Sequence, residues 1–191
     1  KARFNFQKGY CLFHTGKQAE SKPYFESVQN NPLYADNAKY YLGYIAYESD
    51  DYAKAESYFR EVQDDATLSK NVSYFQANMY FKQALYDEAI EEGKKQLAKT
   101  KSAQEVSELN KIIGESYFNQ KKYKEAIPYL QKYKGKKGKF SNTDYYYLGY
   151  AFYKNNDYKA AIEQFNKIVG GNDNVAQNAY YHLAECYLKT D

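Results

Sequence analysis

The chain has 191 residues, with 27 Lys and Arg against 24 Asp and Glu. Its mean hydropathy is −0.90, and no stretch approaches the roughly 18–20 uninterrupted apolar residues that a membrane span needs, which excludes such a span. A net charge of +3 with only two Arg residues argues against nucleic acid as a partner, because phosphate binding draws on concentrated positive charge and on Arg.

Apolar residues recur at helical spacing in segments that alternate with short polar turns. First helices are expected at about 2–15, 35–48, 69–82, 103–119, 142–154 and 175–189. Second helices are expected at about 18–29, 52–63, 86–99, 123–133 and 158–169. Polar triplets such as Ser49-Asp50-Asp51 and Asn155-Asn156-Asp157 separate the members of a pair. The spacing therefore predicts an all-α chain of antiparallel helix pairs.

These pairs repeat along the chain. Each first helix carries a small residue, at intervals of 34, 34, 37, 35 and 35 residues: Gly9, Gly43, Ala77, Gly114, Gly149 and Ala184. Twelve residues later comes a second small residue: Ser21, Ala55, Ala89, Ala126 and Ala161. Four further on is a large apolar residue, except at Gly93: Phe25, Phe59, Leu130 and Phe165. Small residues let two helices approach closely, and the large residue fills the gap between neighbouring units.

The segment LGYIAYESDDYAKAESYF from Leu42 recurs in outline from Ile113 and from Leu148. This pattern resembles the tetratricopeptide repeat (TPR), with W-x2-L-G-x2-Y…A-x3-F…P over 34 residues. The Trp is missing, and only Pro32 lies near the place of the closing Pro. The resemblance implies a right-handed superhelical solenoid of antiparallel helix pairs with about five and a half repeats.

We expect a single TPR solenoid domain over 1–191, with units at approximately 2–35, 36–69, 70–106, 107–141 and 142–176 and a partial unit at 177–191. Three extra residues around Ser102 are expected to lengthen a helix or a linker. Residues 135–139 predict a flexible basic loop. Because the last expected helix has no partner, the chain is expected to be a fragment of a longer array, whose uncapped C-terminal end can self-associate.

Residues that could support catalysis or bind a metal are few. The only two His residues, His14 and His182, fall in the first and last units. His14 lies one helical turn from Cys11, and His182 lies one turn from Cys186. Each Cys–His pair supplies only two of the four ligands that a zinc site needs. Both Cys occupy the repeat position of Ile45, which predicts a packing role. We therefore predict no catalytic activity, no cofactor and no metal.

The lysines of residues 132–139 could meet an anionic partner or a membrane surface, although a solvated loop is the simpler interpretation. The sequence leaves the cellular compartment open, with the periplasm or cell envelope of a bacterium favoured over the cytoplasm.

In the TPR family the first helices line a concave groove that binds an extended peptide or a partner helix. The resemblance places these residues in the groove: Tyr10, Phe13, Tyr40, Tyr44, Tyr47, Tyr74, Asn78, Phe81, Tyr146, Tyr150, Tyr153 and Tyr181. Where the chaperone-binding branch has Lys and Asn for a C-terminal carboxylate, this chain has Tyr40 and Tyr44, so a carboxylate clamp is not expected. Tyr combines a rigid apolar ring with a hydroxyl, which suits protein recognition.

Two functions follow. The first is a non-catalytic scaffold that binds a protein or peptide through the tyrosine-rich concave groove. The alternative is a carbohydrate-binding surface of a cell-envelope protein, because exposed rings beside polar groups also stack on sugars. The patch of Tyr44, Tyr47, Glu48 and Asn78 has that composition. Packing between helices could also account for many of the Tyr residues.

Overall fold

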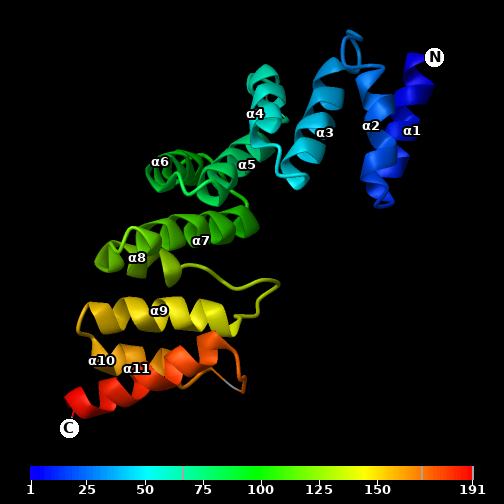
Figure 1. The fold of residues 1–191 in the computed structure, drawn as a ribbon. Coiled ribbons are helices and arrows are strands. Elements are labelled where there is room, and N and C mark those ends of the chain that lie inside the picture. The colour runs from blue at the N-terminus through cyan, green and yellow to red at the C-terminus, as the bar shows by residue number, and fades with distance from the viewer. Residues whose placement is uncertain (66, 169, 191) are drawn as a thin grey trace. The chain divides into compact units, whose positions relative to one another are not determined.

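A computed structural model describes residues 1–65, 67–168 and 170–190 of the chain. These residues form eleven α-helices (Figure 1), and within the same ranges the only β-type pairing is an isolated bridge between Lys136 and Lys139. The predicted all-α class is confirmed. The helices belong to two compact units, Lys1–Met79 and Tyr80–Asp191.

The N-terminal unit contains two complete helix pairs and the beginning of a third. Helix α1 packs on α2, α2 packs on α3, and α3 packs on α4. The helices are α1 (Ala2–His14), α2 (Gln18–Glu26), α3 (Ala35–Glu48), α4 (Tyr52–Glu61) and the first part of α5 (Ser69–Lys82).

The C-terminal unit continues the same arrangement. Helix α7 packs between α6 and α8, α9 packs on α8 and α10, and α11 lies against both α9 and α10. In Figure 1, α7, α9 and α11 lie in successive layers. The helices that lie wholly in this unit are α6 (Tyr86–Leu97), α7 (Ala103–Asn119), α8 (Tyr123–Leu130), α9 (Asn142–Lys154), α10 (Tyr158–Phe165) and α11 (Asn174–Thr190).

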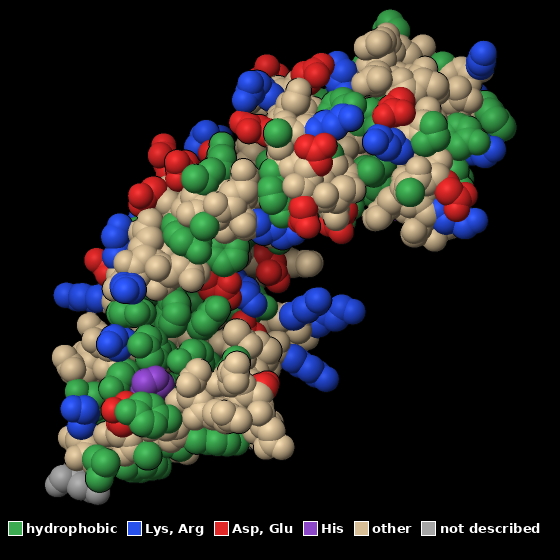
Figure 2. Space-filling view, in the orientation of Figure 1, with side chains coloured by type: hydrophobic (Ala, Val, Ile, Leu, Met, Phe, Trp, Pro, Cys, Tyr) green, Lys and Arg blue, Asp and Glu red, His purple; other side chains and the backbone are tan. Residues whose placement is uncertain are grey.

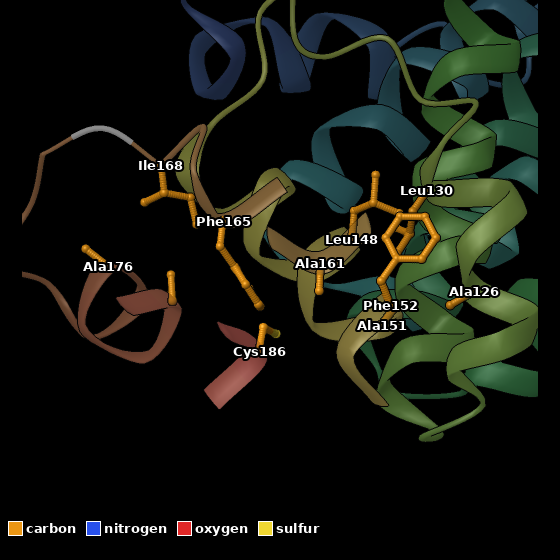
Figure 3. Close-up of a cluster of buried hydrophobic side chains, with 11 residues drawn as sticks. Ala126, Leu130, Leu148, Ala151, Phe152, Ala161, Phe165, Ile168, Ala176 and Cys186 are labelled. Carbon is orange, nitrogen blue, oxygen red and sulfur yellow. The ribbon is translucent and has the colours of Figure 1, made fainter. Parts of the chain in front are cut away.

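The small residues of the repeat lie where the helices of a pair approach closely. A methyl group on Gly43 would come within 2.7 Å of the Phe59 ring, and one on Gly149 within 2.7 Å of the Phe165 ring. In the C-terminal unit Phe165 points toward Cys186 of α11, beside Ala161 of its own helix (Figure 3). The predicted role of the small residues in close helix packing is therefore confirmed.

One residue in each turn between a first and a second helix has a left-handed backbone. It is Gly16 in the first pair, with φ +81°, and a non-glycine residue in the others: Asp50, Ala84, Lys121 and Asn156. This conformation ends the first helix and reverses the chain direction. In the second and fifth pairs an Asp follows this residue, and its carboxylate caps the next helix. Asp51 accepts a hydrogen bond from Lys54 N–H, and Asp157 accepts one from Ala160 N–H.

The second helices are shorter than predicted. They end at residues 26, 61, 97, 130 and 165, while the sequence predicted ends at 29, 63, 99, 133 and 169; position 169 lies outside the described residues. The cause is a tight turn after the helix, in which Val28 N–H donates to Phe25 C=O and Ile168 N–H to Phe165 C=O, both at 3.0 Å. The apolar side chains of these turns are buried, so the apolar spacing continues after the helix has ended.

The extra residues near Ser102 lengthen a helix, because α7 has 17 residues and Ser102 is its N-cap.

The packing role predicted for both Cys residues is right for buried Cys186 and wrong for Cys11, which is exposed. Ile45, at the position equivalent to Cys11, is buried because α2 precedes and contacts α3, whereas α1 is the first helix described.

Candidate functional site

In the N-terminal unit, seven of the predicted groove residues lie on the three first helices. The rings of neighbouring first helices meet edge to face: Phe13 lies 5.2 Å from Tyr44, and Tyr44 lies 5.3 Å from Phe75 between ring centroids. Tyr44 therefore joins the side chains of three helices. The seven residues are Tyr10 and Phe13 on α1, Tyr40, Tyr44 and Tyr47 on α3, and Tyr74 and Asn78 on α5.

These side chains differ in how much surface they expose. Tyr10 is 44% exposed and its ring lies 4.2 Å from that of His14. Tyr44, Tyr40 and Phe13 are half-buried. Tyr47 is only 6% exposed and belongs to the same buried cluster as Phe59. Tyr47 therefore packs the core of this unit and has little surface to offer a ligand.

The acid–base state of these phenols follows from burial. Burial and the neighbouring Glu48 carboxylate raise the pKa of Tyr44, and burial raises the pKa of Tyr41 to about 12. Both hydroxyl groups therefore remain protonated at neutral pH and can donate hydrogen bonds. Glu48 is exposed at the end of α3, so the surface around Tyr44 combines an apolar ring, a donor and a carboxylate.

We call the predicted Tyr residues of the N-terminal unit the first Tyr row. Those of the C-terminal unit form a second Tyr row. Tyr146 and Tyr150 of α9 are stacked with centroids 5.7 Å apart, and Tyr150 lies 5.7 Å from Phe118 of α7. Tyr153 follows 5.9 Å from Tyr150. Phe81 of α5 is half-buried, and its ring contacts that of Tyr86, which lies outside this row.

Glu185 of α11 links this row to the exposed ring of Tyr181. The Tyr153 hydroxyl donates to Glu185 Oε2 at 2.9 Å, and the Tyr181 hydroxyl donates to Oε1 at 3.2 Å. His182 Nδ1 also lies 2.9 Å from Oε2. The hydrogen bond with His182, followed by that with Tyr153, lowers the pKa of Glu185. The carboxylate orients two Tyr side chains, and Tyr181 keeps 62% of its surface exposed.

A charged cluster lies beside this second row. Lys111 Nζ of α7 is 2.8 Å from Asp144 Oδ1 of α9 and 3.6 Å from Glu115 Oε1. Burial and the Asp144 carboxylate raise the pKa of Glu115 to about 7, although Lys111 acts in the opposite direction. Hydrogen bonds from Lys111 and Ser141 outweigh burial and lower the pKa of Asp144. Lys111 thus lies closer to Asp144, whose pKa is lowered, than to Glu115, whose pKa is raised.

The sequence missed two of these features. The position of Glu185 on its helix does not reveal its contact with Tyr153, which is 32 residues away. The pairing of Lys111 on α7 with Asp144 on α9 joins two neighbouring repeats and left no signal in the repeat pattern. Among the described residues, no group of three or more His, Cys, Asp or Glu side chains could hold a metal ion.

Comparisons with known families agree with the repeat. Models described as "Tetratricopeptide repeat" match residues 42–103 and 112–136. A model described as "Anaphase-promoting complex, cyclosome, subunit 3" matches residues 136–191. No curated protein matches the chain.

Solved structures share the fold at low sequence identity. MamA from Desulfovibrio magneticus RS-1 is 18% identical over 87% of this chain and 92% of its own, with a TM-score of 0.71. PilF from Pseudomonas aeruginosa is 14% identical over 98% and 89%, with a TM-score of 0.69. A tetratricopeptide repeat protein from Parabacteroides merdae ATCC 43184 is 14% identical over 98% and 72%, with a TM-score of 0.68.

In the described part of the chain, no helix is long and apolar enough to cross a membrane. The TPR-type fold points to a scaffold for protein–protein interaction, and TPR proteins are in general non-catalytic. On the evidence of the sequence repeat, the stacked helix pairs and the family matches, the chain belongs to the tetratricopeptide repeat family.

Proposed function

We propose that the chain is a non-catalytic scaffold that binds a protein or peptide segment along the Tyr rows of its first helices. The observation that carries this proposal is the position of Tyr44, whose ring lies between Phe13 and Phe75 of the two neighbouring first helices. Its ring is held by packing on two sides, yet it remains half-exposed. A ring held in this way loses little conformational entropy when a partner binds.

Aromatic side chains of this kind commonly contribute most of the binding energy at an interface. Tyr10 offers an exposed ring at one end of the first row, and Tyr181 offers one in the second. Each row also presents a carboxylate, Glu48 or Glu185. The favoured partner is therefore a segment with apolar side chains and backbone or side-chain hydrogen-bond donors.

A peptide display library selected on the wild-type protein tests this proposal. We expect Tyr44→Ser to weaken binding of the selected peptides about tenfold, because Ser lacks the aromatic ring and holds its hydroxyl close to the backbone of α3. Affinities would be measured by fluorescence anisotropy. Tyr24→Ser on the second helix α2 is the matched control, and its affinity should equal that of the wild type. Equal affinity of wild type and Tyr44→Ser would contradict the groove proposal.

The same variants also test the alternative of a carbohydrate-binding surface. Because Tyr47 is buried, only Tyr44 of the two proposed rings has surface for stacking on a sugar, with Glu48 and Asn78 as polar partners. This favours a peptide over a glycan. A glycan array would reverse that preference if wild type bound a sugar and Tyr44→Ser did not.

A second proposal concerns the C-terminal helix, which we propose can bind a second copy of the chain. The small residue of four earlier first helices is covered by the following helix, whereas Ala184 of α11 is exposed. Tyr180, Tyr187 and Leu188 are exposed around it, Leu188 to 82%. Apolar stripes of this kind are characteristic of helix interfaces.

Sedimentation velocity over a range of protein concentrations tests self-association. We expect the wild type to shift from monomer to dimer as the concentration rises, and Leu188→Glu to remain monomeric because a charge at the interface must be desolvated. Leu33→Glu, at another exposed Leu, is the control and should dimerise like the wild type. A wild type that stays monomeric at all concentrations would refute this proposal.

A further inference from the structure

The turn between α8 and α9 concentrates positive charge. Residues 132–139 read KYKGKKGK, with five Lys and no acidic residue, while the whole chain has a net charge of +3. All five Lys side chains are exposed. Within the described ranges, none of the five forms an ion pair with a carboxylate. We call residues 132–139 the lysine turn.

Aromatic packing anchors the two ends of the lysine turn to the helices. Tyr133 is buried, and its ring lies 5.6 Å from that of Phe140. Phe140 in turn stacks on Tyr145 of α9 at 5.3 Å. The backbone N–H of Lys134 donates to Ser107 Oγ of α7 at 2.9 Å. These contacts fix the turn on the C-terminal unit.

The backbone inside the turn is also closed. Lys139 N–H donates to Lys136 C=O at 3.1 Å, and Gly138 N–H donates to Gly135 C=O at 3.3 Å. A methyl group on Gly135 would lie 2.5 Å from the carbonyl oxygen of Lys139, and φ at Gly135 is +78°. The sequence predicted a flexible loop, whereas this backbone forms a hydrogen-bonded turn that requires Gly. The five exposed Lys therefore start from one closed turn of the backbone.

Like charges on one turn repel one another, and an anionic partner that binds there would offset this repulsion. In Figure 2, Lys and Arg side chains (blue) project from the C-terminal unit on the side where Figure 1 shows the loop between α8 and α9. The turn thus presents a localised positive potential to the solvent.

The chemistry of the turn selects among anionic partners. All five cations are Lys, whose ammonium is a hydrated point charge that discriminates little between anion geometries. The two aromatic residues near the turn, Tyr133 and Phe140, pack inward and cannot stack on a nucleic-acid base. Clustered Lys without defined hydrogen-bond geometry matches the diffuse negative potential of a lipid surface. We propose that the lysine turn holds the protein against the surface of an anionic lipid bilayer.

Co-sedimentation with vesicles tests this proposal. Vesicles of phosphatidylcholine with about 30% phosphatidylserine are expected to bind the wild-type chain, and vesicles of phosphatidylcholine alone are not. Each Lys near the surface contributes about fivefold to the partition coefficient, so Lys136→Gln with Lys137→Gln should lower it about 25-fold. Raising the salt from about 0.1 M to about 1 M should release the wild type, because screening then acts over about 3 Å.

The matched control is Lys124→Gln with Lys159→Gln, two exposed lysines on the second helices of the same unit. It changes the net charge by the same amount and should retain wild-type binding. An equal loss in both double variants, or binding to polyglutamate without binding to the anionic vesicles, would overturn the proposal. Tyr44→Ser should bind vesicles like the wild type, which separates this surface from the Tyr rows.

Discussion

Replacing Phe59 by Ala is expected to lower the free energy of unfolding by about 3–5 kcal/mol. The ring of Phe59 is fully buried. It lies over Gly43 and stacks on Phe75 with centroids 5.6 Å apart. Ala would remove these contacts and leave a cavity between two helix pairs, which the close packing around Gly43 cannot fill.

Urea unfolding followed by circular dichroism measures this loss. Phe4→Ala is the matched control, because Phe4 is 63% exposed and its removal should change the free energy of unfolding by about 0.5 kcal/mol or less. If Phe59→Ala and Phe4→Ala lowered the free energy of unfolding equally, the large apolar residue of the repeat would not be the main contact between neighbouring repeats.

The stability of the protein is expected to fall as the pH rises from about 4.5 to about 7, by as much as 3 kcal/mol, because of Glu115. The pKa of this carboxyl is about 7 in the folded chain and 4.5 at its ordinary value. Between these values the folded state holds more protons than the unfolded state, so a higher pH favours unfolding. Asp144 acts in another range: its pKa is lowered, and its contribution is lost only as the pH falls below 3.8.

Glu115→Gln should remove this decline, because an amide does not titrate. The free energy of unfolding of the two proteins would be compared at pH 5 and pH 7.5. Glu48→Gln, at an exposed carboxylate on α3, is expected to retain the wild-type pH dependence. A decline in Glu115→Gln as steep as in the wild type would show that another group binds the proton.

The repeat made much of the fold predictable. Gly43 and Phe59 are 16 residues apart and recur as Gly149 and Phe165, so their contact could be inferred from spacing alone. Every predicted first helix begins and ends within one residue of the observed one. The ends of the second helices were less predictable, because buried Val28 and Ile168 continue the apolar spacing into a turn.

The candidate site was less predictable than the fold. Helical position placed Tyr44 and Tyr47 together in the predicted groove, but only the surrounding helices determine that Tyr44 is half-exposed and Tyr47 buried. The partners that Glu185 and Lys111 have on other helices could not be predicted from the sequence.

The sequence by itself determined the helix pairs, their period and the small and large residues at which they pack, because these depend on contacts at a constant separation along the chain. The tertiary structure alone decided which Tyr rings retain exposed surface, which carboxyl group has a raised pKa and how the lysine turn is closed. These properties depend on side chains from different helices that share one environment, and burial and charge at such a place are sums over all of them.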